Sequence, residues 1–201
     1  MYNFTCEIAA KVIDGLKSKG YAVDPGLNNT EISRVEETFQ ALLPPDFKIF
    51  LQTGVIRNHS RIGNSNNASV PYYPDWRNPE QEVIRSRDWI EQHVFKFDIE
   101  KNNYWHKEFG EKPNDVEEAV HRALSVIRTW PSLFPVHGHR FIPSSPHKTG
   151  NPVLSIWQAT DTVYYGMNLL EHFNMDFHLG LAVVKEAKEP VPFWGDVFDL
   201  N

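Results

Sequence analysis

The first fifty residues of the chain place apolar side chains at the spacing of amphipathic helices. Phe4, Ile8, Val12 and Leu16 recur at helical spacing, and Gly20 stands where a helix commonly ends. This pattern predicts an opening helix with one apolar side. That side needs a partner surface elsewhere in the fold.

Two further helices are predicted on either side of the proline pair Pro44-Pro45. Asn28 can accept hydrogen bonds from backbone N–H groups, and Glu31 lies three residues later. Proline lacks the N–H donor but fits a first helical turn, so a short third helix is expected after the pair, and Gly54 ends it. The apolar positions are Ile32, Val35, Phe39 and Leu42 in the second helix and Phe47, Phe50 and Leu51 in the third.

The segment from Arg57 to Pro79 has no apolar periodicity and is rich in Asn, Ser and Pro. It is predicted to be a loop, and a loop of that length is uncommon unless it is functional or mobile. It contains residue types that dominate protein interfaces, namely Tyr72, Tyr73, Trp76 and Arg77.

Alternation of apolar and charged side chains over residues 95–100 is typical of a strand with one buried face. A sheet is therefore predicted to begin there, with Asp98 pointing outward. Asn114 or Asp115 can cap a helix over residues 116–127, which Pro131 closes. This helix is expected to pack on the sheet.

A β-hairpin is predicted in the last third of the chain. Residues 153–158 and 162–165 are β-branched and aromatic runs separated by a short loop at 159–161. Both strands are expected to be central in the sheet. Helices are also predicted over residues 84–93 and 169–177, and the tail is expected to be irregular but anchored by aromatic side chains.

The order of these elements indicates one α+β domain spanning residues 1–201. Helices come first, and strands interrupted by a helix follow. This order favours N-terminal helices packed on a mostly antiparallel sheet over a doubly wound parallel sheet. With 201 residues, of which 41% are hydrophobic and 13% aromatic, the chain is long enough to bury one sizeable core.

Net charge and cysteine content limit the kinds of partner and the cellular compartment that we expect for the protein. A net charge of −6 with scattered Lys and Arg argues against nucleic-acid binding. Cys6 is the single cysteine, so neither an intramolecular disulfide nor a cysteine-based zinc site can form. Charged residues among the first twenty argue against a signal peptide, and no run is apolar enough to span a bilayer. We therefore expect a cytoplasmic protein that does not cross a membrane.

No assembled catalytic signature is present in the sequence. Glycine-rich phosphate loops, G-x-S-x-G and H-E-x-x-H are all missing, and no cofactor is expected. His137 and His139 are two residues apart on a predicted strand, so they would point to one face and resemble a metal-binding pair. His147, Asp161 and His172 are further candidates, but no second spaced pair exists, and we predict no metal site. The alternative role for these histidines is hydrogen bonding to the backbone or to a carboxylate.

Candidate partner contacts are aromatic and charged side chains. They are Tyr72, Tyr73, Trp76, Arg77, Trp105, His139, Arg140, Asp161 and Tyr165. Trp and Tyr bury a large area at little rotamer cost and keep a polar tip, which suits an interface. Two alternatives remain open: any single aromatic can belong to the core, and His139, Arg140 and Asp161 can form a buried network that fixes the sheet geometry.

Several motifs resemble the SUKH superfamily, which is named after a yeast cell-wall synthesis regulator and includes many bacterial immunity proteins. They are GLNNTEI at 26–32, VE at 35–36, LPPDFK at 43–48 and, more loosely, FDIE at 97–100 with Trp105, PVHGHRFIP at 135–143, GNPV at 150–153 and YYG at 164–166. The resemblance covers about residues 26–177. It departs at 53–56, which read TGVI where many members carry Asn-Gly or Gly-Gly.

The resemblance implies a non-catalytic protein-binding module, whose bacterial relatives are antidotes that bind and block a toxin domain encoded nearby. We therefore expect another protein as the partner, such as a toxin domain, and the acidic charge is compatible with a basic one. A regulatory scaffold like the eukaryotic members would differ only in its partner. The alternative from another class is a small-molecule or metal-dependent enzyme built around His137, His139, Asp161 and Tyr165. The oligomeric state is not indicated.

Overall fold

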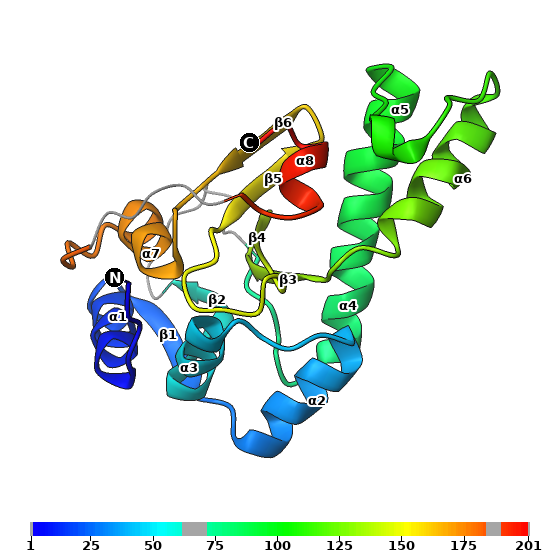
Figure 1. Cartoon of the computed structure of the whole chain (residues 1–201). Helices are drawn as coiled ribbons and strands as arrows, with labels where there is room; N and C mark the ends of the chain where they lie inside the picture. Colours follow the sequence, from blue (N-terminus) through cyan, green and yellow to red (C-terminus); the bar gives the residue numbers. More distant parts are fainter. Residues whose placement is uncertain (1, 62–71, 184–189, 201) are drawn as a thin grey trace.

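The computed structural model describes residues 2–61, 72–183 and 190–200, and the expected α+β class is confirmed (Figure 1). The N-terminal elements are α1 (Cys6–Ser18), β1 (Tyr21–Pro25), α2 (Asn29–Phe39), α3 (Pro45–Thr53) and β2 (Gly54–Arg61). The middle of the chain is helical, with α4 (Pro79–Asp88), the π-helix η1 (Trp89–Lys96), α5 (Phe97–Lys101), the 3-10 turn η2 (Lys107–Phe109) and α6 (Val116–Ile127). The C-terminal elements are β3 (Leu133–His137), β4 (Arg140–Pro143), β5 (Leu154–Gln158), β6 (Asp161–Tyr164), α7 (Leu169–Phe177) and α8 (Trp194–Val197).

The strands form two antiparallel sheets. Strands β1 and β2 pair with each other, and the larger sheet has the order β3-β4-β5-β6. The predicted hairpin is confirmed as β5 and β6, with Leu154 opposite Tyr164 and Ser155 opposite Val163. The expectation that both strands are central is correct for β5 alone, because β6 lies at the edge of the sheet.

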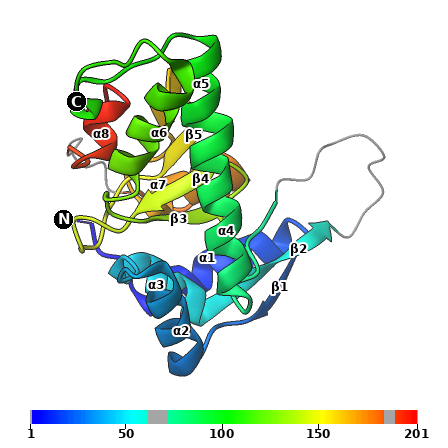
Figure 2. The ribbon, with the colours of Figure 1, turned by 90° about the vertical axis from the view of Figure 1, so that its right-hand side faces the viewer.

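The larger sheet separates two hydrophobic cores. On one face, Phe134 and Ile142 pack with α1, α2, α3 and α7 to form the first core. On the other face, Phe141 and Leu154 pack with η1, α6 and α8 to form the second core. Helices α1 to α3 accordingly lie on one side of this sheet and α6 and α8 on the other (Figure 2). Side chains of a strand alternate between faces, so apolar residues on both faces require cover on both.

Local signals set the ends of the predicted helices. The Glu31 N–H donates to Asn28 Oδ1 at 3.0 Å and the Asn28 N–H donates to Glu31 Oε2 at 2.8 Å, which completes a capping box at the start of α2. Pro45 occupies the first turn of α3, and Gly54 follows its last residue. The Glu118 N–H donates to Asp115 at the start of α6 at 2.8 Å. The predicted helices in these regions are confirmed.

The predicted strand over residues 95–100 is wrong, because this segment belongs to η1 and α5. Phe95 and Ile99 are buried four residues apart, which is helical spacing, whereas Phe97 is 41% exposed. Asp98 is fully buried, and it accepts hydrogen bonds from the backbone N–H groups of Ala159 and Thr160. It thereby ties the helical segment to the β5–β6 turn. No helix among the described residues is long and apolar enough to cross a membrane.

The predicted loop from Arg57 to Pro79 is also partly wrong. Arg57–Arg61 continues β2, where Asp24 of β1 forms an ion pair with Arg57. Local sequence does not reveal this strand, because its partner β1 lies about thirty residues earlier in the chain. Residues 62–71 lie outside the described part of the chain, and α4 begins at Pro79, ahead of the predicted helix start.

Replacing Asp98 tests the link between helix and hairpin. Asp98→Ala is expected to lower the free energy of unfolding by about 2–4 kcal/mol, because backbone donors of the turn would lose their acceptor. Chemical denaturation at neutral pH measures this change. Glu100→Ala, two positions away and exposed, is the matched control and should change stability by less than about 0.5 kcal/mol. Equal stability of the two variants would contradict the anchoring role.

Candidate functional site

Two of the predicted partner contacts lie in the first core. Tyr73 is 1% exposed and Trp76 is 3% exposed. The Trp76 ring lies 5.6 Å from the ring of Phe47 and 5.9 Å from that of Phe39. A partner therefore cannot reach Tyr73 or Trp76 in this conformation, and the alternative that they are core residues is the correct one.

The other predicted contacts before the sheet have structural partners. The Tyr72 hydroxyl donates to the Glu82 carboxylate, and the Arg85 guanidinium carbon lies 3.8 Å from the centre of the Tyr72 ring. Arg77 forms an ion pair of 3.0 Å with Glu31 of α2. The Tyr72 contacts hold the segment before α4 against that helix, and the Arg77–Glu31 pair joins it to α2.

Trp105 lies after α5, packs against the second core and is half-buried. Its indole N–H donates to the Gly110 carbonyl at 2.8 Å, and its ring lies 5.3 Å from the ring of Phe109. These contacts close the turn between α5 and α6. The structure does not bring Trp105 into contact with the other predicted site residues.

The prediction that His137 and His139 share one strand face is wrong. His137 ends β3, Gly138 and His139 form the turn, and β4 begins at Arg140. Gly138 has a positive φ of 52°, a conformation that suits a tight turn and favours glycine. The His137 ring is 4% exposed, whereas His139 is half-buried and lies against the exposed ring of Trp157 at 5.1 Å. The two imidazoles therefore lie in different environments, His137 in the protein interior and His139 beside Trp157.

Alternate residues of β4, β5 and β6 form a partly exposed face of the larger sheet, which we call the open face. It comprises Arg140, Ser155, Asp161, Val163 and Tyr165, and His139 and Trp157 lie at its end, where a β-bulge between Ile156 and Gln158 interrupts the alternation. The intervening side chains of Leu154, Ile156 and Tyr164 turn to the second core. Trp157 is 51% exposed and Val163 is 49% exposed, whereas Ser155 is 8% exposed, so this face is accessible on the edge strand β6 and at Trp157.

Arg140 organises the polar part of the open face. Its guanidinium carbon lies 3.8 Å from the centre of the Tyr165 ring, and its Nη1 donates to Ser155 Oγ at 2.9 Å. Nη1 also contacts His139 Nε2. Burial and the positive charge of Arg140 lower the pKa of His139 to about 4, so this imidazole is neutral at pH 7 and accepts from Arg140. Asp161 is exposed, and its charge acts on His139 in the opposite direction.

A buried His-His-Asp cluster, formed by His137, His172 and Asp176, adjoins the open face. His137 Nε2 lies 2.6 Å from Asp176 Oδ2 and 3.2 Å from His172 Nε2. Tyr165 joins this cluster to the open face, because its hydroxyl donates to Asp176 Oδ1 at 3.3 Å. The Tyr165 carbonyl accepts from His172 Nδ1 at 3.1 Å. Tyr165 therefore holds both Asp176 and His172 in position through hydrogen bonds.

Burial and contacts set the charges in this cluster. Burial and the neighbouring His137 lower the pKa of His172 to about 3, so His172 is neutral at pH 7. Burial alone would raise the pKa of Asp176. The hydrogen bond and charge of His137 outweigh that effect and bring the pKa of Asp176 to about 2. Asp176 thus carries a full negative charge beside two imidazoles.

Asp176 is not among the predicted site residues, and the predicted cluster of His137, His139, Asp161 and Tyr165 does not converge on one point. His139 and Asp161 lie on the open face, His137 lies in the buried cluster, and Tyr165 lies between the two. A usable signal was present, because His172 and Asp176 are four residues apart on a correctly predicted helix and so share one side of it.

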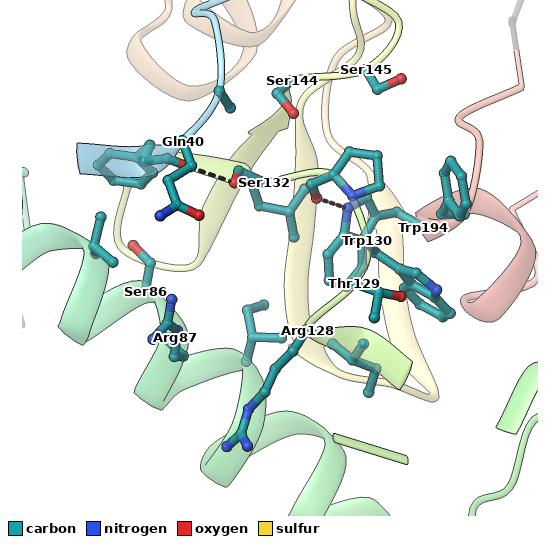
Figure 3. Close-up of a pocket in the computed structure, with 18 of the residues that line it drawn as sticks. Gln40, Ser86, Arg87, Arg128, Thr129, Trp130, Ser132, Ser144, Ser145 and Trp194 are labelled. Carbon is teal, nitrogen blue, oxygen red and sulfur yellow. Dashed lines mark hydrogen bonds between the residues drawn. The ribbon is translucent and has the colours of Figure 1, made fainter. Parts of the chain in front are cut away.

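A wide cleft of about 860 Å³ lies elsewhere, between the end of α2, the α4–η1 helix and the segment that joins α6 to β3. Figure 3 shows its labelled lining, Gln40, Ser86, Arg87, Arg128, Thr129, Trp130, Ser132, Ser144, Ser145 and Trp194. Ser132 Oγ donates to the Phe39 carbonyl at 2.9 Å, and the Trp194 indole donates to the Pro131 carbonyl at 2.8 Å. These two donors are thus engaged by backbone carbonyls, and the cleft's described lining presents no hydrogen-bonded nucleophile and base.

Comparisons of the chain with protein-family models, with curated proteins and with solved structures found no match. The resemblance to the SUKH superfamily therefore stays a prediction that rests on the motifs quoted above. Function is inferred here from the open face and from the buried cluster.

Replacing Arg140 by Lys tests whether the stacking of Arg140 on Tyr165 stabilises the open face. Arg140→Lys is expected to lower the free energy of unfolding by about 1 kcal/mol, because an ammonium group cannot lie flat on Tyr165 while donating to Ser155. Thermal and urea unfolding measure the change. Arg122→Lys on α6, an exposed position, is the control and should stay within about 0.5 kcal/mol of the wild type. If the free energy of unfolding of Arg140→Lys equals that of the wild type, the stacked geometry does not contribute to stability.

Proposed function

We propose that this protein is a non-catalytic binding module that docks a partner protein on its open face. The observation that carries the proposal is the pair of half-exposed apolar side chains, Trp157 and Val163, on rigid neighbouring strands. They stand beside Arg140, which is stacked on Tyr165. Trp, Tyr and Arg are the types that dominate binding energy at interfaces, and strands lose little entropy when a partner docks.

The charges of the open face define the chemistry of the partner. Arg140 donates to a hydroxyl and to a neutral imidazole, and no described carboxylate forms an ion pair with it. Asp161 presents an exposed carboxylate at the far end of β6. The fitting partner surface has an apolar projection for Trp157 and Val163, an acceptor for Arg140 and a basic group for Asp161.

The resemblance to the SUKH superfamily supports a more specific proposal. A bacterial member of that group would act as an immunity protein in the cytoplasm and cover a toxin domain encoded nearby. The net charge of −6 suits a basic partner. The alternative of an enzyme built on His137, His139, Asp161 and Tyr165 would need these side chains to converge, whereas His137 contacts Asp176 and His139 contacts Trp157.

Partner capture with matched variants tests the docking face. The tagged protein is purified from its native cell, its retained partner is identified by mass spectrometry, and the affinity is measured with the purified pair. Val163→Ser and Trp157→Ala are expected to weaken binding by about tenfold or more, since both remove exposed apolar area from the face. Ile84→Ser is the control, because Ile84 is 60% exposed on α4 and outside the face.

Thermal unfolding of each variant separates loss of binding from loss of fold. Equal partner affinity for Val163→Ser and the wild type would overturn docking on this face. Loss of binding in Ile84→Ser alone would move the interface to α4. A single partner encoded beside the gene, whose toxicity this protein neutralises, is the expected result for an immunity protein.

A further inference from the structure

The geometry of the buried cluster points to a function separate from partner docking. We propose that His137, His172 and Asp176 form a site for one divalent transition-metal ion of the zinc class, which joins the end of β3 to α7. One ligand atom from each of the three residues lies within 4.8 Å of the others. Two imidazoles and one carboxylate make a ligand set for zinc or ferrous iron, whereas magnesium and calcium prefer oxygen alone.

The spacing of the two imidazole nitrogens fits tetrahedral coordination. Zinc–nitrogen bonds of about 2.0–2.1 Å place two tetrahedral ligand atoms about 3.3–3.4 Å apart. The observed separation of His137 Nε2 and His172 Nε2 is 3.2 Å. Asp176 Oδ2 is closer to His137 Nε2, at 2.6 Å, and has to withdraw by less than an ångström. Its side chain is 20% exposed, so it has room to do so.

Hydrogen bonds aim His172 at the ion position. A metal binds the neutral form of histidine, and because the Tyr165 carbonyl can only accept, the contact at 3.1 Å places the proton of that form on His172 Nδ1. The lone pair of Nε2 then faces His137 and Asp176. A metal-binding histidine normally donates its other N–H to a carbonyl or carboxylate in this way, which fixes the ring and its tautomer. The Tyr165 hydroxyl holds Asp176 Oδ1 at 3.3 Å and leaves Oδ2 for the ion.

Packing holds the three ligands in place before any ion binds. His172 and Asp176 are four residues apart on α7, and the His137 ring lies 5.5 Å from the Tyr73 ring and 5.4 Å from the Phe177 ring. An apolar surround of this kind strengthens the attraction between ligand and ion. The exposed side of Asp176 leaves a fourth position that water can occupy.

His137 is the weakest member of the site. Its Nδ1 is buried and has no hydrogen-bond partner among the described residues. An ion on Nε2 would require the proton on Nδ1, where no described residue accepts it. The missing contact should lower the affinity by about 10- to 100-fold relative to a site in which both histidines are supported.

Metal titration of the full-length protein tests the site. Chelator-treated protein is incubated with zinc chloride, passed over a desalting column and analysed for bound metal and melting temperature. One zinc ion per chain and a melting temperature that rises with zinc concentration are expected. Cobalt chloride should give the visible absorption bands of tetrahedral cobalt, which report coordination directly.

Variants decide whether these three residues bind the ion. Asp176→Asn is nearly isosteric and sits at the exposed edge, and it should weaken zinc binding at least about tenfold. His172→Ala should abolish the cobalt bands. His121→Ala on α6 is exposed and serves as the control, and Val163→Ser should bind zinc like the wild type, which separates this site from partner docking.

Absence of bound zinc, of a thermal shift and of tetrahedral cobalt bands in the wild type would overturn the proposal. So would undiminished binding by Asp176→Asn. Either result would leave the cluster as a His137–Asp176 contact that only stabilises the fold. If His172→Ala fails to fold, the cobalt spectrum of the wild type and the Asp176→Asn titration still decide.

Discussion

Burial of both faces of the β3–β4 hairpin is the constraint on which the rest of the structure depends. Phe134 and Ile142 project to one side of this hairpin, and Leu133 and Phe141 project to the other. Neither face can be left in water without losing the burial of large side chains. Helices α1, α2, α3 and α7 cover one side, and η1, α6 and α8 cover the other. Two hydrophobic cores therefore share one four-stranded sheet.

The open face and the buried cluster lie where helices no longer cover both sides of the sheet. Strand β6 lies at the edge of the sheet, so the face around Val163 extends beyond the first core and remains accessible. The chain then turns from β6 into α7, which returns to the end of β3 and places Asp176 against His137. Tyr165 lies at this turn. It touches Arg140 on one side and Asp176 on the other, so the proposed docking face and the proposed ion site share one side chain.

Residue type identified a usable candidate site residue only where that residue also lies on an accessible face of the fold. Arg140 and Tyr165 were selected for residue type, and they lie on the open face because alternate strand positions share a face. Tyr73 and Trp76 were selected for the same reason, yet they fill the first core. Residue type alone cannot separate these outcomes, because a large aromatic side chain suits a core and an interface equally well. Asp176 was overlooked because its partner His137 lies far away in sequence.

The sequence by itself determined the α+β class, the starts of α2, α3 and α6, and the β5–β6 hairpin, because caps, prolines and short turns act within a few residues. Only the tertiary structure decided that residues 95–100 are helical, since their alternating pattern also fits a helix once Phe97 is exposed and Asp98 is buried. It likewise decided the pairing of β2 with β1. Contacts between segments distant in sequence outweigh local preference wherever they bury apolar area or satisfy a buried polar group.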